Sequence, residues 1–380
     1  MGTKMKTRFF ILFLFISIIT FAQPVKFSSV DLEINNFLYD GDWQSADSLI
    51  DQQLQQNPNI PKYHFFKAYS SFYTRYIGND RPGDRATTMR QVQKYTWDAI
   101  TIGEKAEQTT ETKFYIGYSY AFLTRVNIMS GEFWNGYWNA GKAEDYLKEV
   151  IEEDPNCIDA YLALGVHEYF PAVAVNGFQG FLAWLGGMPG DKELGLSYFN
   201  KVEQDGILFK NEAKYILAIV MGFRENDFAQ SYKYWEELSD EFSTNNGFEG
   251  QKSRNYFLAL VEDRGVEFLV TEKDSLQSRY DVNNANILNG LGYNLIGQER
   301  NREALTVLKV NLDLYPEIAN CYDSIAECYM LLGENENAIK YYKIAYRKLD
   351  SDSTANDEFK QRLREGITEK LAEMGSEINS

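Results

Sequence analysis

The sequence predicts an all-α fold in which helical hairpins stack one after another into a solenoid. Small and large apolar residues recur between residues 319 and 350 with the spacing of two antiparallel helices. The same spacing occurs one unit of about 34 residues earlier, in residues 285–318, and again near the start, in residues 27–60. The chain of 380 residues also contains only 8 prolines, which suits a protein made of helices because proline interrupts them.

The clearest unit spans residues 319–350. Ala326 and Ala338 are small residues at positions where the two helices approach closely, and Gly333 turns the corner between them. Large apolar residues at helical spacing fill the surrounding positions, and these are Tyr322, Ile325, Tyr329 and Tyr342. The unit at 285–318 repeats the arrangement with Leu288, Leu291, Gly292, Leu295, Ala304 and Leu308. Two adjacent matches in phase are a much stronger signal than one amphipathic hairpin.

This pattern resembles that of tetratricopeptide-repeat (TPR) proteins. The resemblance is specific in residues 27–58 and 285–345 and looser elsewhere. It implies a TPR-like helical-hairpin solenoid over residues 23–380, wound as a right-handed superhelix, that binds a peptide or protein along its concave groove. The apolar stretch that ends in residues 190–195 is similar to a feature of exported bacterial TPR-like proteins.

The middle of the chain departs from the repeat in two places. Residues 130–141 are interpreted as an aromatic insertion that contains Phe133, Trp134, Tyr137 and Trp138. Phe170-Pro171 is expected to break a helix, and residues 170–190 are interpreted as a second insertion, apolar and rich in glycine. Residues 266–280 are expected to form the second helix of the poorest repeat. Residues 357–374 are expected to form the polar capping helix that the end of a solenoid requires.

The first 22 residues have the pattern of a secretory signal peptide. Lys4, Lys6 and Arg8 precede an apolar run, and small residues follow at its end. The run is about 13 residues long, which is shorter than the roughly 20 that span a bilayer, so a transmembrane anchor is the less favoured interpretation. We therefore expect residues 1–22 to direct export to the periplasm or cell envelope. We expect no transmembrane segment in the mature chain.

The charge of the chain limits the kinds of partner that it could bind. Its formal net charge is -17, and removal of the basic leader would make the remainder more negative. So acidic a protein repels phosphate groups, which argues against nucleic acid as a partner and favours a basic protein or peptide.

The three cysteines, Cys157, Cys321 and Cys328, form no disulfide framework and are expected to be buried as small apolar residues.

The resemblance to TPR proteins implies which side chains would line the groove. In that family they come from set positions of the first helix of each repeat. Carried over to this sequence, the partner-binding candidates are Asn286, Asn289 and Tyr293 in one repeat and Asn320, Asp323 and Glu327 in the next. Some cytosolic TPR proteins hold a terminal carboxylate with lysines at such positions, but acids here would repel it. This lining favours a peptide backbone or a basic segment, and a merely solvated polar surface is the open alternative.

No combination of residues predicts an enzyme. The two histidines, His64 and His167, lack the spacing of a zinc-binding helix, and no nucleophile motif is present. We expect no catalytic residue, no metal and no cofactor. The expected function is that of an exported, non-enzymatic scaffold that binds a protein or peptide. The alternative is an envelope protein that binds a glycan or small apolar molecule in an aromatic pocket formed by the insertions, with candidates Trp134, Tyr137, Trp138 and Trp184.

Overall fold

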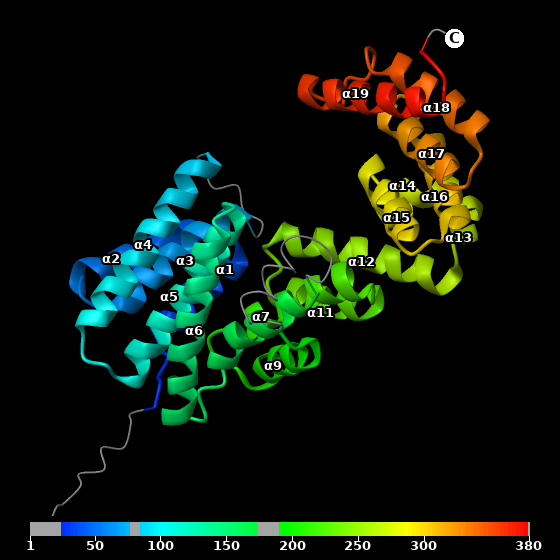
Figure 1. The fold of residues 1–380 in the computed structure, drawn as a ribbon. Coiled ribbons are helices and arrows are strands. Elements are labelled where there is room, and N and C mark those ends of the chain that lie inside the picture. Colours follow the sequence, from blue (N-terminus) through cyan, green and yellow to red (C-terminus); the bar gives the residue numbers. More distant parts are fainter. Residues whose placement is uncertain (1–23, 77–83, 174–189, 379–380) are drawn as a thin grey trace, which may run out of the picture. The chain divides into compact units, whose positions relative to one another are not determined.

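The computed structural model describes residues 24–76, 84–173 and 190–378. The regular structure within these residues consists of helices, without a strand (Figure 1). The prediction of an all-α fold of TPR-like helical hairpins is therefore confirmed. The chain divides into two compact units, which are described separately below. The predicted signal peptide and Trp184 lie outside the described residues.

The first unit contains most of the chain before residue 196, including residues 47–71 and 84–195. Its helices are α2 (Trp43–Gln56), α3 (Pro61–Tyr76), α4 (Arg85–Lys105), α5 (Thr110–Met129), α6 (Phe133–Glu153) and α7 (Ala160–Val173). α5 and α6 form the most extensive hairpin, with Phe114, Ile116 and Leu147 fully buried. A Cβ atom at Gly117 would lie 2.8 Å from Cγ of Leu147, so the two helices meet where α5 has no side chain.

The second unit contains residues 33–46 and 196–380. Most of α1 (Ser29–Asp40) and α9 (Lys192–Asp205) belongs to this unit. The remaining helices are α10 (Lys210–Val220), α11 (Phe228–Glu241), α12 (Asn246–Arg264), α13 (Glu267–Thr271), α14 (Leu276–Tyr280), α15 (Ala285–Gly297), α16 (Asn301–Leu314), α17 (Ala319–Leu331), α18 (Asn335–Lys348) and α19 (Asp357–Glu373). A π-helical turn, η1 (Met221–Glu225), follows α10. The helices α1, α2, α3 and α9 each contribute residues to both units, since residues 72–76 of α3 also belong to the second unit.

Residues 266–280 do not form the single helix that the sequence predicted. They form α13, a 3₁₀ turn at Lys273–Ser275, and α14. The hydroxyl of Thr271 donates to the carbonyl of Phe268, and that of Ser275 donates to the carbonyl of Glu272. Such side-chain bonds compete with the hydrogen bonds of a continuous helix, which explains the interruption.

Several hairpins share one corner between their two helices. A residue one or two positions after the first helix adopts a left-handed backbone, with φ of 84° at Gly41, 77° at Gly131, 62° at Glu299 and 75° at Gly333. The next residue then donates its N–H to a carbonyl five positions earlier, as in Glu334 N to Tyr329 O at 2.9 Å and Arg300 N to Leu295 O at 2.9 Å. This arrangement satisfies carbonyls that the end of a helix leaves free. The same local solution recurs in both units.

The aromatic segment that the sequence analysis interpreted as an insertion at 130–141 is helical from Phe133 onward. α6 begins at Phe133 and places Trp134, Tyr137 and Trp138 in its first two turns. The α5–α6 hairpin is longer than a standard repeat, with helices of 20 and 21 residues, and the additional residues extend both helices. Gly136 permits this extension, because a Cβ there would lie 3.0 Å from Cγ1 of Ile128.

The second predicted insertion begins later than the sequence indicated. α7 continues through Pro171 and ends at Val173, so proline does not break the helix at Phe170. Pro171 has no N–H to donate to the carbonyl of His167, and it lies in the last turn, so the helix ends two residues later. Residues 174–189 of that predicted insertion lie outside the described residues.

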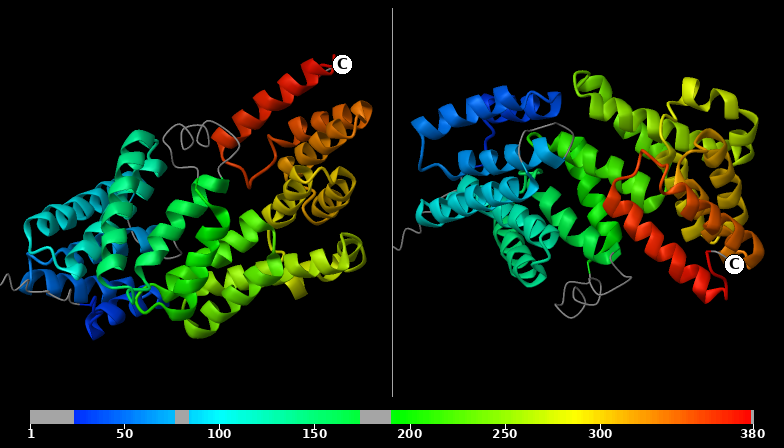
Figure 2. Two further views of the ribbon diagram at one scale, coloured as in Figure 1. Left: turned by 60° about the horizontal axis from the view of Figure 1, so that its bottom comes forward. Right: turned by 90° about the horizontal axis from the view of Figure 1, so that it is seen from above.

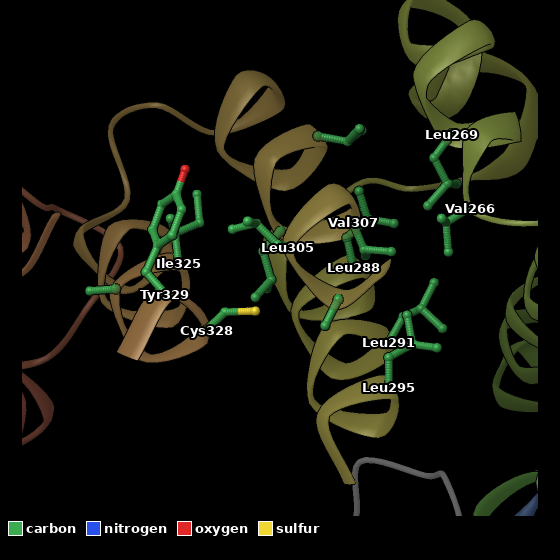
Figure 3. Packing of buried hydrophobic residues seen from close by; sticks show 14 of the residues in the cluster. Val266, Leu269, Leu288, Leu291, Leu295, Leu305, Val307, Ile325, Cys328 and Tyr329 are labelled. Atoms are coloured by element: carbon green, nitrogen blue, oxygen red, sulfur yellow. The ribbon is translucent and has the colours of Figure 1, made fainter. Parts of the chain in front are cut away.

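A continuous apolar core joins the hairpins of the second unit from α12 to α19. In Figure 3, Leu291 and Leu295 lie on the side of α15 that faces Val266, while Ile325 and Cys328 of α17 lie on the opposite side. α19 packs along α18 (Figures 1 and 2) and contributes Ile367 and Leu371, which are 0% and 1% exposed. The core therefore extends to α19.

Candidate functional site

The predicted groove residues lie on α15 and α17, the first helices of the last two hairpins. We call them the first-helix surface, and they are Asn286, Asn289, Tyr293, Asn320, Asp323 and Glu327. Asn284 caps α15 by accepting the N–H of Asn286 at 3.1 Å, which fixes where this row of side chains begins. Asn286 and Tyr293 are exposed, Asn289, Asn320 and Glu327 are half-buried, and Asp323 is buried. The two helices thus present different amounts of polar surface.

Side chains of three helices meet at Glu327. The hydroxyl of Tyr293 on α15 donates to Oε2 of Glu327 at 2.8 Å. Nζ of Lys370 on α19 lies 3.4 Å from the same oxygen and 5.4 Å from the ring centre of Tyr342. Residues predicted from two separate repeats are therefore brought into one cluster, and α19 adds a cation to it.

Sequence reasoning missed Lys370. Residues 357–374 were expected to act only as a polar cap, so no partner for Glu327 was sought there. The available signal was the pair Ile367 and Leu371, which are four residues apart and both buried. That pair determines which side of α19 packs against the preceding hairpin, and Lys370 lies at the edge of that side.

Asp323 is a buried carboxylate whose negative charge is stabilised by few neighbouring groups. It is only 6% exposed, and no described residue donates a hydrogen bond to it. Burial raises the pKa of Asp323 to about 6, although Lys370 opposes the shift; the negative charge of Glu327 adds to it. The hydroxyl of Tyr342 is also buried without a hydrogen-bond partner among the described residues. Asp323 is therefore a covered group in this structure, and α17 presents less acid to a partner than the sequence suggested.

A basic side chain also reaches the α15 side of the first-helix surface. A Cβ at Gly290 would lie 3.9 Å from Nη2 of Arg254 on α12. The guanidinium of Arg254 stacks over the ring of Phe223 at 5.5 Å, and no described carboxylate pairs with it. Burial lowers the pKa of Arg254. The lining therefore includes a cation in addition to the predicted amides and acids.

Asn289 is the groove candidate with an unused polar atom. Its Oδ1 is buried and has no hydrogen-bond partner among the described residues. Its neighbours one turn away on the same face, Asn286 and Tyr293, are exposed to solvent. Because an amide side chain can both donate and accept, this row matches the donors and acceptors of an extended peptide.

The aromatic ligand candidates belong to the first unit. Trp134 and Trp138 are 62% and 68% exposed at the start of α6. The ring centres of Tyr137 and Trp138 lie 5.3 Å apart, and those of Trp134 and Tyr137 lie 6.4 Å apart. These three rings form a cluster at the start of α6. Binding of a glycan or apolar molecule there stays a prediction, because Trp184 lies outside the described residues.

The three cysteine thiols are poorly placed to react as thiolates. Cys157, Cys321 and Cys328 are buried and unpaired, as the sequence predicted for small apolar residues. Burial raises the pKa of Cys157 and Cys321 to about 12 and that of Cys328 to about 11. Within residues 24–76, 84–173 and 190–378, no cluster of three metal-ligating side chains occurs. None of the helices described is long and apolar enough to cross a membrane.

Comparisons with known proteins bear on the fold. No protein-family model matches the chain, and no curated protein matches it significantly. Among solved structures, it is similar to a tetratricopeptide repeat protein from Parabacteroides merdae, with 14% identity over 89% of this chain and 97% of that one and a TM-score of 0.28. It is also similar to the human IFIT1 dimer with PPP-AAAA (15% identity, 81% and 69% coverage, TM-score 0.32) and to yeast Tom70 (13%, 83% and 68%, TM-score 0.29). Scores of this size carry no functional argument, and the TPR-like character of the chain rests on its own helices and corners.

Proposed function

We propose that this protein is an exported scaffold that binds an extended segment of a protein partner on the first-helix surface. The observation that carries the proposal is the polar row Asn286, Asn289 and Tyr293 along α15. Asn286 and Tyr293 of this row are exposed and Asn289 is half-buried, whereas α19 covers part of the polar surface of α17. A TPR-like fold suggests a protein–protein interaction, and the row supplies the hydrogen-bonding groups for it.

In this proposal, hydrogen bonds to the partner's backbone contribute more to binding than attraction to the partner's charge does. A lysine or arginine of the partner could pair with Glu327 only by displacing Lys370, which lies 3.4 Å from its carboxylate. Asn286 needs no such rearrangement, because it is exposed. The net charge of -17 supports a basic partner through long-range attraction, which speeds association more than it strengthens the complex.

The basic start and apolar run of residues 1–22 support export to the periplasm or cell envelope. Export can be tested directly. A reporter fused to residues 1–22 should be exported, and its export should be lost when charged residues interrupt the apolar run.

Binding is tested with peptides selected from a random library by the protein of residues 23–380. The affinity of the selected peptides is then measured by calorimetry for the parent protein and for the double variant Asn286→Ala/Asn289→Ala. Each lost hydrogen bond weakens binding by about 1 kcal/mol, so we expect the dissociation constant to rise by about tenfold or more. The matched control is Glu336→Ala/Lys340→Ala, which removes two exposed side chains of α18 without a change in net charge.

The control should bind within about twofold of the parent protein, since the change lies on a second helix. Equal affinity of the parent protein and the α15 double variant would show that the first-helix surface is not the binding site. Failure of the library to yield any peptide would contradict the proposed function itself.

A further inference from the structure

A cavity lies within the first unit, beside the first turns of α3 and α5. Its volume is 340 Å³, which is within the range of about 300–1,000 Å³ for small-ligand sites. The starts of the two helices form its wall together with residues of the corners that precede them, 57–60 and 106–109. No residue of the first-helix surface or of the ring cluster on α6 lines it. The cavity is therefore a separate candidate site.

The wall of this cavity contains a buried hydroxyl that the described part of the protein leaves unused. Tyr115 of α5 lines the cavity and is 1% exposed. Its hydroxyl has no hydrogen-bond partner among the described residues. A buried polar group without a partner is unfavourable, because it has lost its hydrogen bonds to water without replacing them. A ligand in the cavity could supply the missing partner.

The surroundings of this hydroxyl show that it lies toward the cavity. Burial raises the pKa of Tyr115, and the nearby charges of Asp31 and Glu111 add most to the shift, with a smaller contribution from Tyr63. Glu111 and Tyr63 line the cavity themselves. The hydroxyl therefore stays protonated at neutral pH and can donate as well as accept a hydrogen bond.

The charges in the wall do not favour a charged ligand. Nζ of Lys62 lies 3.1 Å from Oδ2 of Asp31 and 3.1 Å from Oε1 of Glu111, so this cation and both carboxylates are paired with one another. Glu107 is exposed, and water weakens its attraction for a ligand. An anion would meet these carboxylates, and a cation would have to compete with Lys62 for them. A neutral ligand avoids both costs.

The remaining polar groups of the wall are amides and hydroxyls. Asn59 is exposed, and its side chain makes no hydrogen bond to a described residue. The hydroxyls of Thr109 and Thr112 lie 3.0 Å apart at the start of α5. Such groups both donate and accept, and an alkyl chain would leave them without partners. The ring of Tyr63 adds an apolar surface to the same wall.

We propose that this cavity binds a neutral sugar ring, with one ligand hydroxyl bonded to the hydroxyl of Tyr115 and another to the amide of Asn59. A sugar carries donors and acceptors around its edge and C–H groups on its faces. It therefore matches a wall made of hydroxyls, an amide and tyrosine rings. This proposal does not depend on peptide binding at the first-helix surface.

The first test titrates neutral sugars into the protein of residues 23–380. Glucose, galactose, mannose and N-acetylglucosamine are followed by saturation-transfer NMR and calorimetry at slightly acidic pH. The sugar that binds best is then compared with its 2-amino and uronic acid analogues, which keep the ring and add one positive or one negative charge. We expect each charged analogue to bind at least about tenfold more weakly. Absence of binding by every neutral sugar, or tighter binding of a charged analogue, would overturn the proposal.

The second test uses Tyr115→Phe, which removes the buried hydroxyl and keeps the ring. Sugar affinity should fall by about tenfold, whereas stability in urea should not fall, because the hydroxyl has no described partner to lose. Asn59→Ala changes an exposed side chain and should weaken binding in the same direction without any effect on folding. The control Tyr256→Phe removes an exposed hydroxyl of α12 and should leave sugar affinity within about twofold. Unchanged affinity in Tyr115→Phe would refute the assignment of the sugar to that hydroxyl.

The source of the sugar is decided by a further arm of the same experiment. The free sugar is compared with an oligosaccharide that ends in the same sugar. Tighter binding of the free sugar assigns the cavity to a small metabolite, and equal or tighter binding of the oligosaccharide assigns it to the end of a glycan chain. Both outcomes support recognition of a neutral sugar ring.

Discussion

The substitution Asp323→Asn should stabilise the last two hairpins at neutral pH and have little effect in acid. Asp323 is 6% exposed and receives no hydrogen bond from a described residue, so its ionised form is poorly solvated in the folded protein. Asparagine has nearly the same shape and no charge. The change therefore removes the unfavourable charge without a large effect on packing.

The magnitude follows from the pKa of Asp323, which is about 6 in the folded protein against an ordinary value of 3.8. A difference of about 2 units corresponds to about 3 kcal/mol. The folded state binds the proton more tightly, so the carboxyl costs nothing below about pH 4, and stability falls as the pH rises from about 4 to 6. Asparagine should thus gain up to about 3 kcal/mol at pH 7.5 and almost nothing at pH 4. This figure already contains the attraction to Lys370, because that attraction lowers the pKa from which the figure is worked.

The assay is hydrogen exchange measured by mass spectrometry on fragments of α17 and α18. This local measurement is needed because the last tryptophan of the chain is Trp235, so fluorescence would not report on these helices. A gain of about 3 kcal/mol slows exchange through local unfolding by about 100-fold. The control Glu336→Gln, an exposed acid on α18, should leave exchange unchanged. Equal or faster exchange in Asp323→Asn at pH 7.5 would refute the reasoning.

Four further substitutions test packing and buried polar groups. Gly195→Ala should destabilise the first unit by about 1–3 kcal/mol in thermal unfolding, because a Cβ there would lie 2.7 Å from a backbone nitrogen of α7. Gly250→Ala in α12 should instead stabilise the protein by about 1 kcal/mol, because nothing lies within 4 Å of a Cβ at that position. A loss of stability in both variants would contradict the packing argument. Tyr39→Phe removes the hydroxyl that donates to buried Glu212 at 2.7 Å and should cost about 1–3 kcal/mol in urea unfolding, whereas no loss would show that water replaces it. Tyr342→Phe removes a buried, unpaired hydroxyl and should stabilise by about 1 kcal/mol, measured by exchange in α18, and a loss of stability would reveal a hidden partner for that hydroxyl.

The helices and their corners could be predicted from the sequence because they depend on residues close together in the chain. Gly333 was assigned to a corner and adopts φ of 75° there, and Ala326 and Ala338 are both fully buried where their helices meet. The same local reasoning did not place the start of α6, because residues 130–141 were interpreted as an insertion before the second helix and α6 already begins at Phe133. In that hairpin, packing along α5 outweighs the low helix propensity of these residues.

The candidate site could be predicted only in part. The sequence by itself determined the amides and acids of α15 and α17, since periodicity shows which residues share a helix face. Only the tertiary structure brought Lys370 to Glu327 and Arg254 beside Gly290, and only it placed Tyr115 and Lys62 in the wall of one cavity. Each of these contacts joins different helices whose distance and rotation are determined by the packing of many apolar side chains at once. A pattern within one helix carries no information about that packing, and therefore the charges that distinguish this surface from a plain polar face were decided by the fold.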